Sequence, residues 1–485
     1  MTSRALKRAM RAAAFAVLPS LVAVQAVAAA GPPAPKATAD VLATTSNPYA
    51  GCTIGSGGPG TINYLNAEVE PAVAVDPADT ANVIGVVQQD RWNDGGAHGN
   101  VAMVSHTGGR SFHVVPLPFT ECSSGGLHYQ RASDPWVSFG PDGTAYAIGL
   151  VFDETTPRNG IAAATSTDGG ETWHNIQTID KQTQFVDDKE TVTADPMTPG
   201  TAYAVWDRSP NCCGKPEPSF FSKTTDYGAT WSTPLQMTPT NHNFGEIGNE
   251  IVVNPLNGTL YDFFYRFYRH KRNQYMVISS PDGGTSWSQP TVIADDEGIL
   301  VRDPHKHGKV VRTAAQAIGQ AAIDPATGRL YFVWEDARFS GGAHNAAALS
   351  VSADGSTWSS PRRVSTNTGE AAFLPTVAVN ALGQVAVTYY DFRDYQASDP
   401  SLPTGYWMRI SPPGGNNFGP DIALRAKPFD MLTAPFAEGY FVGDYEGLAG
   451  RGNSFVALFC ATTGQPSNPT DCYGKVVNPN PGSTP

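Results

Sequence analysis

A two-part phrase recurs along the chain and constrains its fold more than any other feature. Each copy begins at a polar residue, continues as an apolar run, turns, and ends in a second apolar run followed by charge. Short apolar runs bounded by turn residues predict β-strands, so each copy predicts a pair of strands. Seven copies are present, the last one weaker, with starts at Glu70, Asp134, Glu190, Glu250, Gln320, Pro375 and Asp444.

An octet with an internal Asp and Gly and a terminal Trp follows several of these copies. Asp caps local amides and Gly adopts positive φ, so the octet predicts a tight turn. Its Trp is expected to pack between neighbouring sheets. The full copies are Ser166–Trp173, Thr224–Trp231 and Ser280–Trp287, and the imperfect ones are Ser352–Trp358 and Ser105–Phe112.

The spacing of these repeats predicts the fold class. Four-stranded units that cannot bury both faces alone must stack around an axis. The sequence therefore predicts an all-β fold, a β-propeller of six or seven four-stranded blades, over residues 65–465. The segment around Ile62–Tyr64 is expected to supply the outer strand that closes the last blade, and residues 466–485 are expected to form a tail.

The composition excludes two classes of protein. The 485 residues carry a net charge of −12, with 16% charged and 10% aromatic residues, and no basic run. Disordered chains have few aromatic residues, and nucleic-acid binders present a basic patch, so neither class fits. Because a closed propeller leaves only short, protected strand edges, we expect a monomer.

Residues 1–30 have the features of a secretory signal peptide. Four basic residues precede an apolar stretch over residues 12–29, which ends in Ala28–Ala30. A basic head, an apolar middle and a small-residue exit are typical of such peptides. The alternative is a membrane anchor, for which the Ala-rich run is only marginally long enough. We therefore expect a secreted or periplasmic protein with no membrane segment after cleavage, in which residues 31–64 form an N-terminal arm.

Six cysteines agree with an oxidising compartment. Cys460 and Cys472 are expected to pair across a short hairpin, and Cys52 and Cys122 to tie the arm to the body of the protein. Cys212–Cys213 are adjacent, and either a vicinal disulfide or pairing elsewhere fits their spacing. The absence of a Cys-x-x-Cys motif argues against a zinc site built from thiolates.

The octets resemble the Asp-boxes of the sialidase superfamily of β-propellers, and the resemblance covers about residues 65–460. It implies a site at the rim of the funnel, which the starts of first strands and the ends of second strands reach. The polar residues at the seven strand starts would then surround the axis. Charged pairs such as Asp90-Arg91 and Asp391–Arg393 would lie just outside them. The alternative is a structural ring in which these charges pair with one another.

The resemblance also implies roles for single residues. Asn249-Glu250, followed by Arg266, resembles the family's Asn-Glu pair and an arginine that binds the substrate carboxylate. Tyr445 resembles the nucleophilic tyrosine, which Glu250 would polarise. Asp94 would act as the general acid or activate water.

Two departures from the family pattern affect the arginines. At the first inner strand the family has an Arg-Ile-Pro motif, where this chain has Val69-Glu70-Pro71. The third arginine has no unique match, because Arg312, Arg338 and Arg393 all compete for it. The candidate substrate-binding residues are therefore Arg266, Arg312, Arg393, Arg91, Glu70 and Trp92.

These residues predict a glycoside hydrolase of the exo-α-sialidase type that needs no cofactor. One alternative is a non-catalytic carbohydrate-binding propeller that stacks sugars on Trp92, Trp136, Trp206, Tyr390 and Tyr406. A second alternative is a polysaccharide lyase that acts on uronic-acid polymers. A Ca²⁺ site built from rim carboxylates is compatible with all three, because hard cations prefer oxygen ligands.

Overall fold

The computed structural model describes residues 34–210, 218–305, 308–313 and 317–480, so the predicted signal peptide, Cys212 and Cys213 lie outside the described residues. Regular structure in these ranges is β-strand, apart from two 3-10 turns, η2 (Arg338–Ser340) and η3 (Met431–Thr433). The described part of the chain is therefore all-β, as the sequence predicts. Among the described residues, no helix is long and apolar enough to span a membrane.

The first two blades are antiparallel four-stranded units joined at one point. A single residue pair, Ala97 with Ala132, links them into one sheet. The first blade consists of β3 (Glu68–Val75), β4 (Val83–Arg91), β5 (Ala97–Ser105) and β6 (His113–Pro116). The second consists of β7 (Arg131–Phe139), β8 (Ala145–Phe152), β9 (Asn159–Ser166) and β10 (His174–Gln182).

The next four blades repeat the same strand order. The third comprises β11 (Val186–Ala194), β12 (Ala202–Ser209), β13 (Ser219–Thr224) and β14 (Leu235–Gln236). The fourth comprises β15 (Phe244–Val253), β16 (Leu260–Tyr268), β17 (Gln274–Ser280) and β18 (Thr291–Asp295). The fifth comprises β19 (Gln320–Ile323), β20 (Leu330–Asp336), β21 (Ala346–Ser352) and β22 (Arg362–Arg363). The sixth comprises β23 (Ala372–Val379), β24 (Val385–Asp391), β25 (Pro403–Ser411) and β26 (Ile422–Ala423), and β27 (Phe429–Asp430) also pairs with β25.

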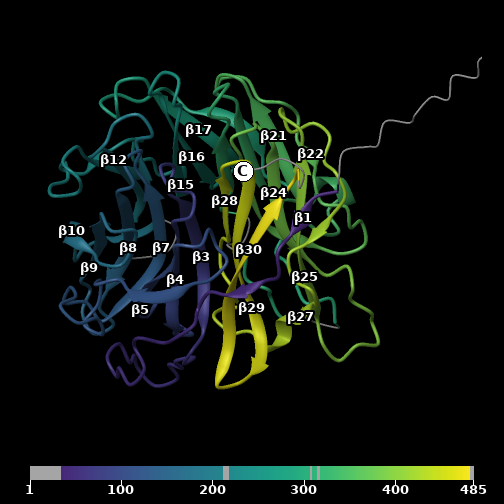
Figure 1. The fold of residues 1–485 in the computed structure, drawn as a ribbon, viewed down its shortest axis with the longest axis horizontal. Coiled ribbons are helices and arrows are strands. Elements are labelled where there is room, and N and C mark those ends of the chain that lie inside the picture. Colours follow the sequence, from purple (N-terminus) through teal and green to yellow (C-terminus); the bar gives the residue numbers. More distant parts are fainter. Residues whose placement is uncertain (1–33, 211–217, 306–307, 314–316, 481–485) are drawn as a thin grey trace, which may run out of the picture. The chain divides into compact units, whose positions relative to one another are not determined.

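Both ends of the described chain build the last blade. Its strands are β28 (Gly447–Arg451), β29 (Ser454–Gln465) and β30 (Asn468–Asn478), and β1 (Lys36–Ala37) and β2 (Val41–Leu42) pair with β30. Figure 1 shows the N-terminal β1 beside the C-terminal β30. The arm closes the blade as predicted, but not with Ile62–Tyr64, because Asn63 forms a bridge with Trp92 of the first blade. The predicted tail also begins too early, since β30 lies within residues 466–485.

The innermost strands form a closed ring. β3, β7, β11, β15, β19, β23 and β28 contact one another in turn, and β28 returns to β3. Over the described residues, the chain is thus a seven-bladed β-propeller.

The octets form turns whose aromatic residues pack between blades. In the octet after β9, Ser166 Oγ donates to Asp168 Oδ1 at 2.8 Å, and the Thr172 amide donates to the same oxygen at 3.0 Å. Gly170 has φ of 99°, which favours glycine. Trp173 is buried in a cluster with residues of the first two blades. These turns therefore fix the spacing of neighbouring blades.

Two disulfides stabilise the last blade and the N-terminal arm. Cys460 and Cys472 join β29 to β30, and Cys52 and Cys122 join the arm to the loop after β6. Both predicted pairs are confirmed. They are consistent with an extracytoplasmic protein.

Candidate active site

Irregularities in the inner strands place polar residues at one end of the axis. The strand register shifts between Val69 and Ala72 in β3, between Ser133 and Trp136 in β7, and between Asp188 and Thr191 in β11. Bulges of this kind re-aim side chains and occur beside active sites. The residues inside these bulges, Glu70, Asp134 and Lys189, have φ of 60°, 45° and 50°. Left-handed backbone at non-glycine residues is strained, and such strain concentrates at functional sites.

The three bulges meet at Lys189. Its Nζ lies 2.7 Å from Asp134 Oδ2, 2.8 Å from Asp444 Oδ2 and 3.5 Å from Glu70 Oε1. Arg312 approaches from the opposite side and donates to both oxygens of Asp444, from Nε at 3.2 Å and from Nη2 at 2.9 Å. The centre of the propeller is therefore a compact ion-pair cluster held by strands of different blades.

Arg91 belongs to the same cluster. Its Nη1 donates to Gln88 Oε1 at 2.8 Å, and the Gln88 amide in turn donates to Glu70. The guanidinium groups of Arg91 and Arg312 lie 5.0 Å and 4.5 Å from the centre of the Phe441 ring. Two of the predicted substrate-binding arginines and Glu70 are thus brought together at the axis.

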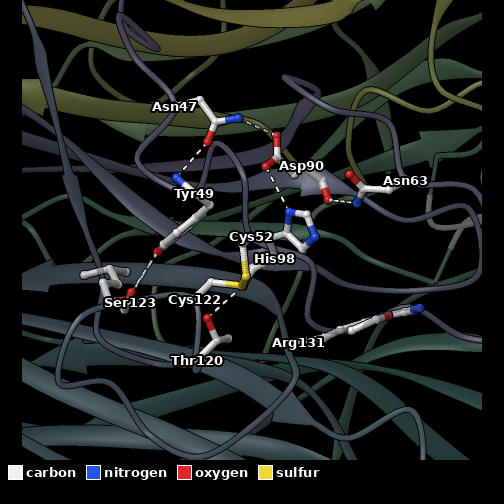
Figure 2. The surroundings of a disulfide bond; sticks show 12 residues. Asn47, Tyr49, Cys52, Asn63, Asp90, His98, Thr120, Cys122, Ser123 and Arg131 are labelled. Atoms are coloured by element: carbon white, nitrogen blue, oxygen red, sulfur yellow. Dashed lines mark hydrogen bonds and ion pairs between the residues drawn. A yellow bond between two sulfur atoms is a disulfide. The ribbon is translucent and has the colours of Figure 1, made fainter.

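The arm fixes the residue that precedes Arg91. Figure 2 shows Asp90 between Asn47 of the arm and His98 of β5. Asn47 Nδ2 donates to Asp90 Oδ1 at 2.7 Å, and His98 Nδ1 lies 3.0 Å from Asp90 Oδ2. Asn63 donates to the Asp90 carbonyl at 2.8 Å. Asp90 is buried, and both its carboxyl group and its carbonyl are hydrogen-bonded. These bonds hold the backbone at Asp90 and thereby position Arg91 at the axis.

The carboxyl groups around Lys189 differ strongly in pKa. Burial and, to a smaller extent, nearby Asp134 raise the pKa of Asp188 to about 6 against the lowering effect of Lys189. Burial also opposes ionisation of Asp444, but Arg312 and Lys189 outweigh it and hold the pKa of Asp444 well below its usual range. Asp188 therefore takes up a proton as the pH falls through about 6, whereas its neighbour Asp444 stays ionised.

These two carboxyl groups open onto one pocket. It has a volume of about 440 Å³, within the range of pockets that bind small ligands. Its polar wall is formed by Asp188, Lys189, Arg312, Glu438 and Asp444, and its apolar wall by Ile247, Leu300, Val310, Val311, Ala317 and Ile318. Glu438, at the tip of a tight loop with φ of 63°, is mostly exposed.

Glu250 and Tyr445 line a much smaller cavity of about 20 Å³, together with Asp134, Lys189 and Glu190, and Lys189 lines both this cavity and the pocket. The Tyr445 hydroxyl donates to the Pro135 carbonyl at 3.3 Å, and burial raises its pKa well above the usual value. Glu250 accepts a hydrogen bond from the Ala321 amide at 2.8 Å, and burial raises its pKa to about 8. The predicted nucleophile and its predicted partner therefore line one cavity.

These buried acids predict that the protein is more stable at pH 5 than at pH 8. Burial, with Asp134 adding to it, raises the pKa of Glu70 to about 8, and burial alone does so for Glu250, so both bind protons in the folded state that the unfolded chain releases above about pH 4.5. Stability is full below the unfolded pKa and falls as pH rises to about 8. The loss should exceed ~1 kcal/mol. Urea unfolding at both pH values measures it, and equal midpoints would contradict this prediction.

The remaining predicted site residues lie away from this cluster. Arg266 Nε donates to Glu246 at 2.9 Å, and its guanidinium lies over the Phe244 ring. Arg393 pairs with Asp391 and Asp421 and stacks on Trp407. Asp94 accepts from Arg131 at 2.8 Å, at the edge of the first blade.

The aromatic residues proposed as sugar platforms are mostly part of the core. Trp206 and Tyr390 are fully buried, Tyr406 is 1% exposed, and Trp92 is 6% exposed beneath the guanidinium of Arg131. Trp136 is half-buried and touches the edge of Tyr445. Trp206 and Tyr390 lie on the second strands of their blades, Tyr406 on a third strand, and Trp92 just after β4. All four rings are buried, so they present no free ring face to a sugar.

Lys189 is not among the site residues that the sequence predicts. The repeats were aligned on Glu190, whereas the structure shows that Lys189 occupies the bulge position of Glu70 and Asp134. The run Asp187-Asp188-Lys189-Glu190, with one cation among three acids at a strand start, is the signal that could have identified it. Within the described residues, no group of three His, Cys, Asp or Glu side chains is arranged to hold a metal ion, so a Ca²⁺ site stays a prediction.

No protein-family model and no curated protein matches this sequence. The chain has distant structural similarity to solved propellers at low sequence identity. A protein of unknown function from Dyadobacter fermentans is 14% identical, with 87% of this chain and 100% of that chain covered and a TM-score of 0.47. A Hadza microbial sialidase is 16% identical over 80% of this chain and 75% of its own, with a TM-score of 0.45. An α-L-arabinofuranosidase from Fusarium graminearum is 11% identical over 73% and 93%, with a TM-score of 0.44.

Proposed function

We propose that the protein is a glycan-active propeller that hydrolyses glycosidic bonds in the pocket at Asp188 and Asp444. The observation that carries this proposal is the divergence of the two pKa values, one raised to about 6 and the other lowered, inside one pocket of ligand size. Neighbouring carboxyl groups whose environments push their pKa values apart are suited to separate acid and base roles.

The proposed reaction uses these two groups in sequence. Asp188 donates its proton to the glycosidic oxygen as the bond from that oxygen to the anomeric carbon breaks. Asp444, kept ionised by Arg312 and Lys189, orients the attacking water and accepts its proton. One water is consumed: Asp444 then releases the proton of that water to solvent, and Asp188 regains one from solvent, so both groups return to their starting states.

The charge of the pocket favours a neutral sugar. Lys189 lies against Asp134 as well as Asp444, and Arg312 bonds Asp444, so both cations already have carboxylate partners. An anionic sugar would face Asp188, Asp444 and Glu438 with no cation left to clamp it. Bidentate arginine is the usual partner of a sugar carboxylate, and this pocket has only one, already bound.

A sialidase-type mechanism is the second candidate, because Tyr445 and Glu250 line one cavity and Arg91 and Arg312 flank the same Phe441 ring. In that case Tyr445 attacks the anomeric carbon as the bond from that carbon to the aglycone oxygen breaks, and water then releases the sugar from the tyrosine. Glu250 accepts the hydroxyl proton only in its ionised form, which is the major one above about pH 8. The substrate is then an α-sialoside. The two candidates differ in which residue the activity requires.

The test is turnover of a panel of fluorogenic glycosides that includes neutral pyranosides, an α-L-arabinofuranoside and an α-sialoside. We expect hydrolysis of a neutral glycoside that declines above about pH 6, as Asp188 loses its proton. Asp188→Asn and Asp444→Asn should each lower kcat/KM by at least ~100-fold. Glu297→Gln, at an exposed carboxyl outside the pocket, is the matched control and should have wild-type activity.

The outcomes separate the candidates. Turnover of the α-sialoside alone, abolished in Tyr445→Phe and retained in Asp188→Asn, overturns the proposed mechanism in favour of the second candidate. No turnover of any glycoside by a folded protein overturns hydrolysis altogether. An unsaturated product that absorbs in the ultraviolet, formed from a uronic-acid polymer, would instead identify a lyase.

A further inference from the structure

A second pocket adjoins the pocket at Asp188 and Asp444 and is distinct from the cavity at Tyr445. It has a volume of about 510 Å³ and is lined by residues 299–304, which follow β18, by residues 343–345 before β21, by residues 370–371 before β23, and by Phe392. Leu300 lines both pockets and is 42% exposed. The two pockets therefore lie on either side of one apolar side chain.

Three polar side chains that line this pocket, those of Arg302, His344 and Glu370, have few or no partners within the described residues. Within the described residues, the side chains of Arg302 and Glu370 have no recorded ion pair or hydrogen bond, unlike the arginines of the central cluster. Burial lowers the pKa of His344, and nearby Arg363 lowers it further, while a hydrogen bond to the Thr368 carbonyl uses only one ring nitrogen. Burial also raises the pKa of Glu370. Imidazole, carboxyl and guanidinium groups all exchange hydrogen bonds with hydroxyl groups, so these three side chains can bind a sugar.

The frame of this pocket is rigid. Asn345 is buried, and its Oδ1 accepts from the Ile299 amide at 2.9 Å. Its Nδ2 donates to the Ile299 carbonyl at 2.7 Å and to Glu335 at 2.8 Å. This side chain ties the segment that carries Leu300 to the start of β21. On the other flank, His305 contacts Asp303 and the Asp399 carbonyl. A pre-formed wall lowers the ordering cost of binding.

We propose that the second pocket is a sugar subsite, so that the ligand is a neutral oligosaccharide. One unit occupies the pocket at Asp188, and the chain crosses Leu300 so that its next units bind Arg302, His344 and Glu370. This inference rests on the proposed function for the identity of the first pocket. It adds that chain length, rather than one terminal sugar, determines affinity.

Calorimetry with neutral arabino-, xylo- and galacto-oligosaccharides, from monosaccharides to hexasaccharides, tests the subsite without requiring turnover. We expect affinity for one series to rise at least ~10-fold with chain length. His344→Ala and Glu370→Ala should abolish that rise and leave both monosaccharide affinity and turnover of an aryl monoglycoside unchanged. His128→Ala, at a histidine on the surface of the first blade, is the control and should preserve the rise.

The possible results separate this inference from the proposed function. Length-dependent binding that the two variants abolish, in a protein with no turnover, supports the subsite and overturns only the hydrolase. Turnover with affinity that does not depend on length overturns the subsite. A length dependence that survives both variants also overturns it, because the chain must then extend elsewhere.

Discussion

Lys189→Met should lower the free energy of unfolding by about 3–5 kcal/mol. Lys189 is the one cation within 3.5 Å of Asp134, Asp444 and Glu70 together in the described structure, and its side chain is 11% exposed. Removing it leaves three buried carboxyl groups without their shared partner, and uncompensated buried charge is costly. Urea denaturation followed by circular dichroism measures the loss.

The pH dependence of that loss distinguishes charge from packing. Glu70, whose pKa is raised to about 8, is protonated at pH 5 and half ionised at pH 8, so the destabilisation of Lys189→Met should be smaller at pH 5 than at pH 8. A purely steric defect would cost the same at both. Lys189→Arg, which keeps the charge, should recover part of the stability, and Lys181→Met on exposed β10 should change it by less than ~0.5 kcal/mol. Equal losses at both pH values would show that the cluster is not held by charge.

The parts of the fold that were predictable from the sequence are those with local signals. The octets combine Asp, Gly and an aromatic residue within eight positions, and turn chemistry depends only on such neighbours. The octet-like segment Ser411–Phe418 was missed because it lacks the Asp, although Phe418 packs against the buried cluster of blades five and six. The inner strand pairs followed from the repeat, whereas the disulfides were predicted from the places of the cysteines: two across a short hairpin, and two that join the arm to the body.

The closing strands could not be located from the sequence. β1 and β2 have two residues each, too short for any alternating pattern, and they form strands only because β30 offers an unpaired edge. Ile62–Tyr64 looked more strand-like because it contains larger apolar residues. In the structure this segment instead lies against the first blade, where the Ile62 amide donates to Asn93 at 2.7 Å. Tertiary pairing, not propensity, decided the outcome.

The sequence predicted the region of the central cluster and some of its residues, but not Lys189 or the pairing of the arginines. Strand starts indicated the axis, and Glu70, Arg91 and Arg312 are indeed together there. Which arginine remains available depends on neighbours distant in sequence: Arg266 is taken by Glu246, and Arg393 by Asp391 and Asp421. A sequence pattern does not reveal such ion pairs, because the partner of each arginine depends on which strands and loops the fold brings next to it.

The double variant Cys52→Ala/Cys122→Ala should lower the free energy of unfolding by about 4 kcal/mol. The bond closes a loop with a sequence separation of 70, and the chain-entropy estimate for a loop of that length is roughly 4 kcal/mol. The effect extends beyond the loop itself, since the arm that it anchors also carries β1 and β2 on the last blade and Asn47 at Asp90 (Figure 2). Thermal unfolding measures the loss, and amide exchange in β30 should increase because its outer partner is freed.

Reduction of the wild-type protein provides the matched comparison. Cys52 and Cys122 are half-buried, whereas Cys460 and Cys472 are fully buried, so a mild thiol reductant should reach the first pair in the folded state. Reductant is therefore expected to lower the wild-type Tm to that of the variant and to leave the variant unchanged. A variant with the wild-type Tm would mean that the hydrogen bonds of Asn47 and Tyr49 alone hold the arm. In that case ring closure depends on strand pairing and not on the covalent link.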